Sequence, residues 1–163
     1  MNKDDVILGI KSQLKEEDFP LANLANFLAF IFELPDISWA GVYLHIDGEL
    51  ILGPFQGRPA CNRIAPSKGV CGQAFAKKET LRVEDVHAFS GHISCDPGSK
   101  SELVIPILVG DRAYGVLDLD SYKEGRFSPE DQIFFEEALK RLNQSLDWVK
   151  LIEGLEGAYK PRN

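Results

Sequence analysis

Residues 38–46, "SWAGVYLHI", alternate between two sets of side chains, and this alternation constrains the fold more than any other feature of the sequence. A period of two places the two sets on opposite faces of a β-strand. One face carries Ala40, Val42, Leu44 and Ile46, and the other carries Trp39, Gly41, Tyr43 and His45. The residues "DGE" at 47–49 follow as a hairpin turn. The segment "LILGPF" is therefore predicted to pair with the first strand in an antiparallel sheet.

A second hairpin is predicted over residues 102–121, with its turn at "GDR". Helices are predicted on both sides of the two hairpins, because apolar residues recur there with helical spacing. The apolar residues of the two N-terminal helices are Val6, Ile10 and Leu14, then Leu24, Leu28 and Phe32. The last helix opens at "FSPED" and has an apolar stripe of Phe135, Leu139, Leu142, Leu146 and Val149.

The order of these elements predicts an α+β fold in which helices cover one side of an antiparallel sheet. The 163 residues suit a single domain, 1–163, whose sheet is flanked by N- and C-terminal helices. Between the hairpins we expect a glycine-rich loop over 57–72, a short helix over 71–79, a strand in 80–86 and a long loop over 87–101. Residues 154–163 are predicted to form a frayed tail.

Charge and hydropathy exclude several classes of protein. The net charge of −7 argues against a general nucleic-acid binder, which needs a basic face for phosphate. No signal-peptide pattern opens the sequence, and no apolar run reaches the roughly 20 residues that span a bilayer. We therefore expect a cytoplasmic protein that does not enter membranes.

Three cysteines, Cys61, Cys71 and Cys95, lie in or beside loops. An odd number excludes a fully paired disulfide scaffold, and no Cys-x-x-Cys motif signals a dithiol or a zinc ribbon. Cys71 lies near a predicted helix start, where backbone N–H groups favour the thiolate. Cys95 lies in the long polar loop, a kind of segment that is often functional. The cysteines could also be inert small side chains. Alternatively, Cys95 could bind a metal with His87, His92 and a distant cysteine, although that spacing fits no standard zinc site.

Three carboxylates are predicted to meet at one face of the sheet. Asp118 and Asp120 flank one residue in a strand, so both point to the same face, together with Tyr114 and Val116. Glu102 begins the adjoining strand. Such a group could bind an ammonium ion, and if the acids are crowded one of them holds a proton. The alternative is an ordinary solvated sheet face.

Trp39 and Tyr43 project together from the first predicted strand. Aromatic packing within the core would explain them. They could also form the wall of a pocket that holds a methyl or thioether group.

Several long segments, in order, resemble the free methionine-(R)-sulfoxide reductases, which are small enzymes with the GAF fold. These segments are "WAGVYL", "LGPFQGRPAC", "SKGVCG", "VEDVHAFSGHISCD", "SELVIPI" and "GVLDLDS…GRFSPEDQ". The resemblance extends from about Ser38 to Gln132. It implies a single GAF-like domain whose core, residues 38–132, carries the functional motifs.

The resemblance also implies roles for single residues. Cys95 matches the nucleophile of the family, and Cys61 matches the cysteine that resolves the oxidised nucleophile. Cys71 matches a third cysteine, which can pair with Cys95, so the choice between Cys61 and Cys71 as the resolving cysteine stays open. The positions that match substrate-binding residues are Glu102, Asp118, Asp120, Trp39 and Tyr43.

The implied reaction is reduction of free L-methionine-(R)-sulfoxide to L-methionine. Cys95 would become a sulfenic acid and then part of a disulfide, which thioredoxin or a similar dithiol would reduce. No cofactor and no metal are expected, and a homodimer through the terminal helices is possible by resemblance. Two alternatives stay open, namely a GAF module that only binds a small ligand and a redox sensor that uses Cys71 and Cys95.

Overall fold

The structure is a computed structural model that describes residues 1–14 and 19–157. Its helices are α1 (Lys3–Gln13), α2 (Pro20–Phe32), α3 (Gly69–Lys77), α4 (Pro129–Ser145) and α5 (Trp148–Glu156), with a short 3-10 helix, η1 (Val86–Ala88). Its strands are β1 (Trp39–Ile46), β2 (Glu49–Gly57), β3 (Arg63–Ile64), β4 (Leu81–Val83), β5 (Ser101–Val109) and β6 (Arg112–Ser121). Within the described residues these strands form one sheet in the order β3-β2-β1-β6-β5-β4, and all neighbours are antiparallel. The predicted α+β class is confirmed.

The alternation in β1 is confirmed, and it divides the interior into two clusters. Ala40, Val42 and Leu44 belong to a large cluster under α1, α2, α4 and α5. Trp39 and Tyr43 belong to a smaller cluster on the opposite face. Burial of apolar surface stabilises both, at about 25 cal/mol for each Å² removed from water. The sheet thus separates the large core, which lies under the terminal helices, from the smaller apolar cluster on its other face.

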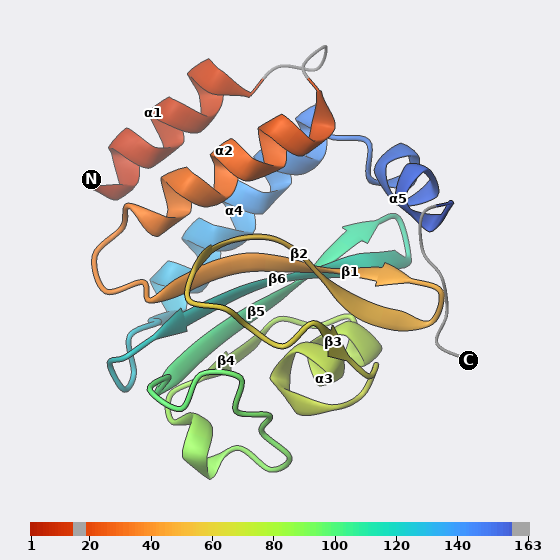
Figure 1. The fold of residues 1–163 in the computed structure, drawn as a ribbon. Helices are drawn as coiled ribbons and strands as arrows, with labels where there is room; N and C mark the ends of the chain where they lie inside the picture. The colour runs from red at the N-terminus through yellow and green to blue at the C-terminus, as the bar shows by residue number, and fades with distance from the viewer. Residues whose placement is uncertain (15–18, 158–163) are drawn as a thin grey trace.

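Helices cover both faces of the sheet, so the prediction of helices on one side is wrong for α3. Figure 1 shows the N- and C-terminal helices on one side of the sheet and α3 on the other, beside the loop that follows β4. Val70 and Ala74 of α3 pack in the smaller cluster. The helical period reveals the apolar stripe of α3, but it does not reveal which face of the sheet that stripe covers.

A β-bulge in β6 corrects the predicted position of Tyr114. Ile107 pairs with Gly115 while Leu108 pairs with Ala113, so Tyr114 is the extra residue. Its side chain lies in the helix-side cluster, whereas Val116 lies in the smaller cluster on the opposite face. The prediction that Tyr114 shares a face with the carboxylates is therefore wrong.

Gly115, next to the bulged residue, is required by the close packing of β6 against β1. A Cβ atom on Gly115 would lie 2.1 Å from the carbonyl oxygen of Tyr43 in β1. Any other residue would push the two central strands apart.

The predicted C-terminal helix is two helices. Helix α4 begins at Ser128 with a capping box and ends at Ser145. Asp147 then caps α5 by accepting a hydrogen bond from the backbone N–H of Lys150, at 3.0 Å. Val149 is exposed, so it does not extend the stripe of α4. Residues 154–156 of the predicted frayed tail belong to α5, and residues 158–163 lie outside the described part.

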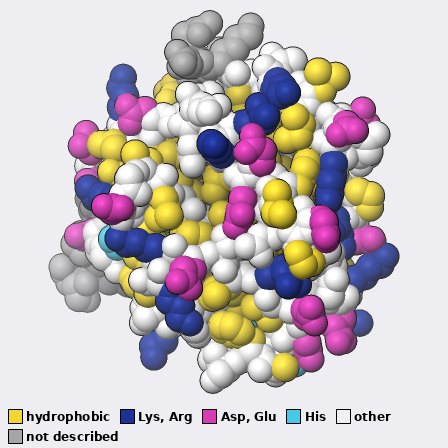
Figure 2. Space-filling view, turned by 180° about the vertical axis from the view of Figure 1, so that it is seen from behind, with side chains coloured by type: hydrophobic (Ala, Val, Ile, Leu, Met, Phe, Trp, Pro, Cys, Tyr) yellow, Lys and Arg dark blue, Asp and Glu magenta, His cyan; other side chains and the backbone are white. Residues whose placement is uncertain are grey.

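Two further observations concern the surface charge and the length of the helices. Figure 2 shows acidic and basic side chains interspersed over the face seen from behind, without a large area of one sign. In the part of the chain that the structure describes, no helix is both long and apolar enough for a membrane span.

Candidate active site

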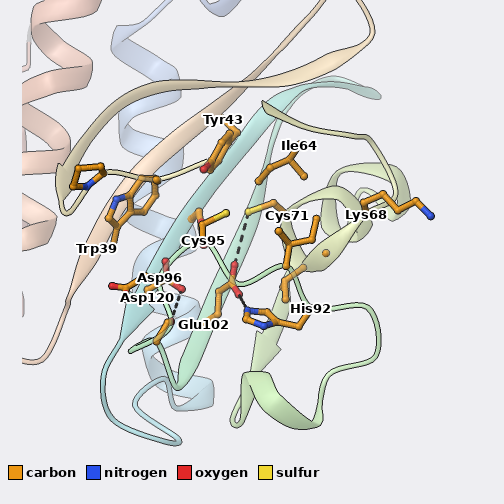
Figure 3. Close-up of a pocket in the computed structure, with 17 residues that line it drawn as sticks. Trp39, Tyr43, Ile64, Lys68, Cys71, His92, Cys95, Asp96, Glu102 and Asp120 are labelled. Atoms are coloured by element: carbon orange, nitrogen blue, oxygen red, sulfur yellow. Dashed lines mark hydrogen bonds and ion pairs between the residues drawn. The ribbon is translucent and has the colours of Figure 1, made fainter. Parts of the chain in front are cut away.

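A pocket opens on the sheet face opposite the four terminal helices (Figure 3). Strands β1, β5 and β6 form its floor, α3 forms one wall, and the loop between η1 and β5 covers it. The residues singled out in the sequence that line it are Trp39, Tyr43, Cys71, Cys95, Glu102, Asp118 and Asp120. Cys61 reaches the pocket through a disulfide bond to Cys95. The tertiary structure thus brings together residues from four strands and helices and from two loops.

The register of the sheet explains why the carboxylates meet. Glu102 of β5 lies directly opposite Asp120 of β6, and Asp118 lies two residues along the same strand. All three therefore point into the pocket from one face. Glu102 and Asp118 are each only 6% exposed. This is a buried acidic group and not the solvated sheet face that was the alternative.

Burial and mutual repulsion raise the pKa values of these acids. Burial, and then the charges of Asp118 and Asp120, raise the pKa of Glu102 well above its usual value. Burial and then Asp118 also raise the pKa of Asp120 strongly, although a hydrogen bond from Ser99 opposes this. Burial raises the pKa of Asp118 to about 6, and contacts with Glu102 and Cys71 limit the rise. Because the charge of Asp118 raises the pKa of both neighbours, Asp118 is the acid of this group that ionises first.

Asp118 also has an unused acceptor. Its Oδ1 atom is buried and has no hydrogen-bond partner among the described residues. A buried polar atom without a partner costs about 1–3 kcal/mol. A cationic or hydrogen-bonding ligand in the pocket would remove this cost.

The cysteines lie in two different environments. Cys61 and Cys95 form a disulfide whose Cα atoms are 5.4 Å apart, a usual separation for a disulfide. Cys71 has a free thiol in the first turn of α3, and its Sγ donates to Oε1 of Glu102 at 3.8 Å. The partner of Cys95 in this structure is therefore Cys61, not Cys71.

The prediction that the N-terminus of α3 favours a Cys71 thiolate is wrong. Burial, followed by the nearby carboxylates, raises the pKa of Cys71 well above its usual value. Cys71 Sγ and one oxygen each of Glu102 and Asp118 all lie within 4.8 Å of one another. A second negative charge in this space is unfavourable, so Cys71 stays a thiol.

The aromatic pair forms a wall and also holds the segment that carries Cys61. The ring of Trp39 stacks on Phe55 at 5.3 Å and on Tyr43 at 6.1 Å between centroids. Gly41 makes room for that ring, because a Cβ there would lie 2.3 Å from it. The Tyr43 hydroxyl donates to the carbonyl oxygen of Cys61 at 2.9 Å. The sequence predicted the wall but not this hydrogen bond.

Polar contacts of the covering loop are the part of the site that the sequence did not reveal. Ser99 Oγ donates to Asp120 at 3.0 Å, and the Tyr122 hydroxyl donates to Asp96 at 2.7 Å. The backbone N–H of Gly98 also donates to Asp96, in a turn whose only sequence signal is "DPG". These bonds hold the residues that directly follow Cys95 beside the acids.

The histidines do not form the metal site that was considered. Cys95 is bonded to Cys61, and His87 belongs to no cluster of three possible ligands among the described residues. His92 instead faces Glu102, with 3.8 Å between His92 Nε2 and Glu102 Oε2.

Comparison with known proteins connects this pocket to a group of relatives. A family model described as the GAF domain matches residues 20–146. A free methionine-R-sulfoxide reductase from Escherichia coli (strain K12) is 47% identical over 141 residues, covering 84% of this chain and 86% of its own. A protein of the same name from Saccharomyces cerevisiae is 42% identical over 134 residues, covering 77% of this chain and 74% of its own.

The fold of a solved structure agrees as well. A free methionine-R-sulfoxide reductase from Neisseria meningitidis, solved in complex with its substrate, superposes with a TM-score of 0.85. It is 39% identical, and the match covers 91% of this chain and 90% of that one.

Proposed function

The chain belongs to the free methionine-R-sulfoxide reductases of the GAF-domain family, and from this premise we propose how its own residues reduce the free amino acid sulfoxide. The observation that carries the proposal is the position of Cys95. This cysteine lines a pocket whose floor is a buried acidic group with one unpartnered oxygen, on Asp118. A reactive sulfur thus lies in the same small space as groups that bind an ammonium ion and donate a proton.

The acids divide two tasks between them. Asp118, which is ionised at neutral pH, attracts the α-ammonium group of the substrate, and its free Oδ1 accepts a hydrogen bond from it. A peptide-bound sulfoxide has no such ammonium group, and its chain would have to enter a buried space. This explains a preference for the free amino acid.

Glu102 performs the other task as the proton donor. Burial and its acidic neighbours raise its pKa, which favours the protonated carboxyl group over the carboxylate. A protonated carboxyl can hydrogen-bond the sulfoxide oxygen and protonate it as the S–O bond breaks. Trp39 and Tyr43 provide an apolar wall for the methyl and thioether part of the substrate.

The chemical step transfers one oxygen atom and two electrons. The Cys95 thiolate takes the oxygen of the sulfoxide, and a proton from Glu102 completes the sulfenic acid. The sulfur of Cys95 is oxidised by two electrons while the sulfur of the substrate is reduced by two. The product that leaves is methionine.

Recycling uses the disulfide partner of Cys95. The Cys61 thiol attacks the sulfenic sulfur, a disulfide forms, and water leaves with the oxygen and two protons. A dithiol such as thioredoxin then reduces the disulfide and becomes a disulfide itself. A compartment that maintains such a reductant, the cytoplasm, fits this cycle. A homodimer through the terminal helices remains a prediction.

The substrate is tested with three sulfoxides and a chemical reductant. The purified chain is given free methionine-R-sulfoxide, the free S epimer or a peptide-bound sulfoxide, each with dithiothreitol, and methionine is measured by chromatography. We expect methionine from the free R epimer alone. Binding of that epimer without methionine formation would instead favour the non-catalytic ligand-binding module.

The roles of the cysteines are tested in the same assay. Cys95→Ser is expected to abolish turnover. Cys61→Ser is expected to slow later turnovers more than the first, because it blocks only the resolving step. Normal activity of Cys95→Ser would refute the scheme.

A further inference from the structure

His92 lies beside the acids and has no part in the proposed reaction. It lies in the loop between η1 and β5, where its backbone N–H donates to the carbonyl oxygen of Phe89 at 3.2 Å. Phe89 in turn packs against the apolar cluster of the pocket. The backbone of His92 is therefore held by a turn whose Phe89 side chain packs against the apolar cluster.

The imidazole is more exposed to solvent than the Glu102 carboxyl group beside it. Its Nε2 atom is 3.8 Å from Oε2 of Glu102, and its side chain is 14% exposed where that of Glu102 is 7% exposed. Figure 3 shows Cys71 and His92 approaching the Glu102 carboxyl group from different directions. Oε1 of Glu102 faces the Cys71 thiol and Oε2 faces His92.

Glu102 needs a source of protons during the reaction. When it protonates the sulfoxide oxygen, it would become an anion close to the ionised Asp118, and burial and repulsion oppose that charge. The neighbouring thiol of Cys71 holds its proton tightly for the same reasons. An imidazole can give a proton from one nitrogen and take one at the other.

We propose that His92 is a proton relay between solvent and Glu102, which rests on the function proposed above. As the O–H bond of Glu102 breaks and the proton passes to the sulfoxide oxygen, His92 gives the Nε2 proton to Oε2 of Glu102. The other ring nitrogen takes a proton from water or from a buffer acid. The carboxyl group of Glu102 ends the step neutral, and no buried anion accumulates. His92 acts through Glu102 and does not touch the substrate.

The charges around His92 support this role. Burial, followed by His87 of η1, lowers the pKa of His92, so the ring is neutral at neutral pH and has a free acceptor nitrogen. The other titratable groups that line the same pocket are Glu102, Cys71, Asp118, Asp120, Tyr43, Asp96 and Lys68. An anion that begins to form on Glu102 attracts a proton onto the ring.

Two variants and one control test the relay. His92→Gln keeps a hydrogen-bonding side chain but cannot relay a proton, and His92→Ala leaves space that added imidazole can fill. His45→Gln, in β1 and outside the pocket that His92 lines, is the matched control. Release of methionine from free methionine-R-sulfoxide is measured with pre-reduced protein in a single turnover, between pH 6 and pH 9. Circular dichroism checks that each variant is folded.

We expect both His92 variants to react about tenfold more slowly at neutral pH, with little change in the sulfoxide concentration at half-maximal rate. Their rates should fall more steeply than that of the wild type as the pH rises, because fewer protons are available directly from water. Imidazole should restore the rate of His92→Ala, and His45→Gln should match the wild type within about twofold.

Three results would overturn the relay. The first is a wild-type rate in His92→Gln at every pH, and the second is an effect on substrate affinity alone. The third is a loss of rate that imidazole does not restore in folded His92→Ala, which would make His92 a structural residue. Wild-type protein that forms no methionine would instead refute the proposed function, so the two failures are distinct.

Discussion

Replacing Asp118 by asparagine should change the free energy of unfolding by an amount that depends on pH. The difference between the variant and the wild type should favour the variant more at neutral pH than at acidic pH. The reason is the cost of a buried carboxylate. Burial raises the pKa of Asp118 from 3.8 to about 6. Below pH 3.8 the carboxyl is protonated in both the folded and the unfolded chain, and it contributes no pH dependence.

The magnitude follows from the difference between the two pKa values. As the pH rises from 3.8 to about 6, the unfolded chain loses the proton first, so unfolding becomes easier. Each pKa unit is worth about 1.4 kcal/mol, so the total is about 3 kcal/mol above pH 6. Between pH 4 and pH 7.5 the change is about 2 kcal/mol. Asparagine does not ionise, so the variant does not lose this free energy.

The comparison of two pH values removes those effects of the substitution that do not depend on pH. The new amide can lack a hydrogen-bond partner, which costs about 1–3 kcal/mol, but this cost is the same at both pH values. Loss of the Asp118 charge also relieves Glu102 and Asp120, whose pKa values it raises. This second effect also favours the variant at neutral pH, so about 2 kcal/mol is a lower bound for the pH-dependent difference.

The assay is urea unfolding of the oxidised proteins at pH 4 and pH 7.5, because urea does not screen charges as guanidinium does. Asp111→Asn, at the exposed turn between β5 and β6, is the matched control and should show no such pH dependence. An equal stability difference for Asp118→Asn at both pH values would refute the argument from burial. A difference of opposite sign would mean that the folded protein stabilises the anion.

Two further substitutions and one alkylation experiment test the packing and the thiols. Gly115→Ala should lower the free energy of unfolding by about 3 kcal/mol or more, because its Cβ would lie 2.1 Å from the Tyr43 carbonyl oxygen. Urea unfolding measures this, and Gly154→Ala, at a helical site with open space, should be neutral or stabilising; equal stabilities would contradict the clash. Tyr43→Phe should cost about 1 kcal/mol through loss of the hydrogen bond to Cys61, and it should slow disulfide closure more than methionine release. A thiol count after one equivalent of sulfoxide measures the closure, and an unchanged rate would show that this bond does not position Cys61. In the reduced protein at neutral pH, Cys71 should be alkylated by iodoacetamide more slowly than Cys61, because burial and the acids raise the pKa of Cys71. Peptide mass spectrometry follows each cysteine, and faster alkylation of Cys71 would mean that its thiolate is accessible.

Local patterns were sufficient for most of the fold. The alternation in β1 and the two hairpins depend on neighbouring residues only, so the sequence determined which side chains share a face. For the same reason Asp118 and Asp120 could be placed together from the sequence, and Glu102 could be placed near them. Local reasoning failed at Tyr114, because a bulge there depends on the close approach of Gly115 to another strand.

The chemistry of the site depended on distances that the sequence does not contain. Cys61 and Cys95 are 34 residues apart in the chain, and only the folded chain shows that they are partners while Cys71 is not. The position of α3 over the second face of the sheet is equally non-local, and it buries Cys71 among the acids. The sequence by itself determined which residue types face one another across the sheet. The tertiary structure decided which thiols meet and which acids keep a proton, because both depend on burial and on contacts between distant segments.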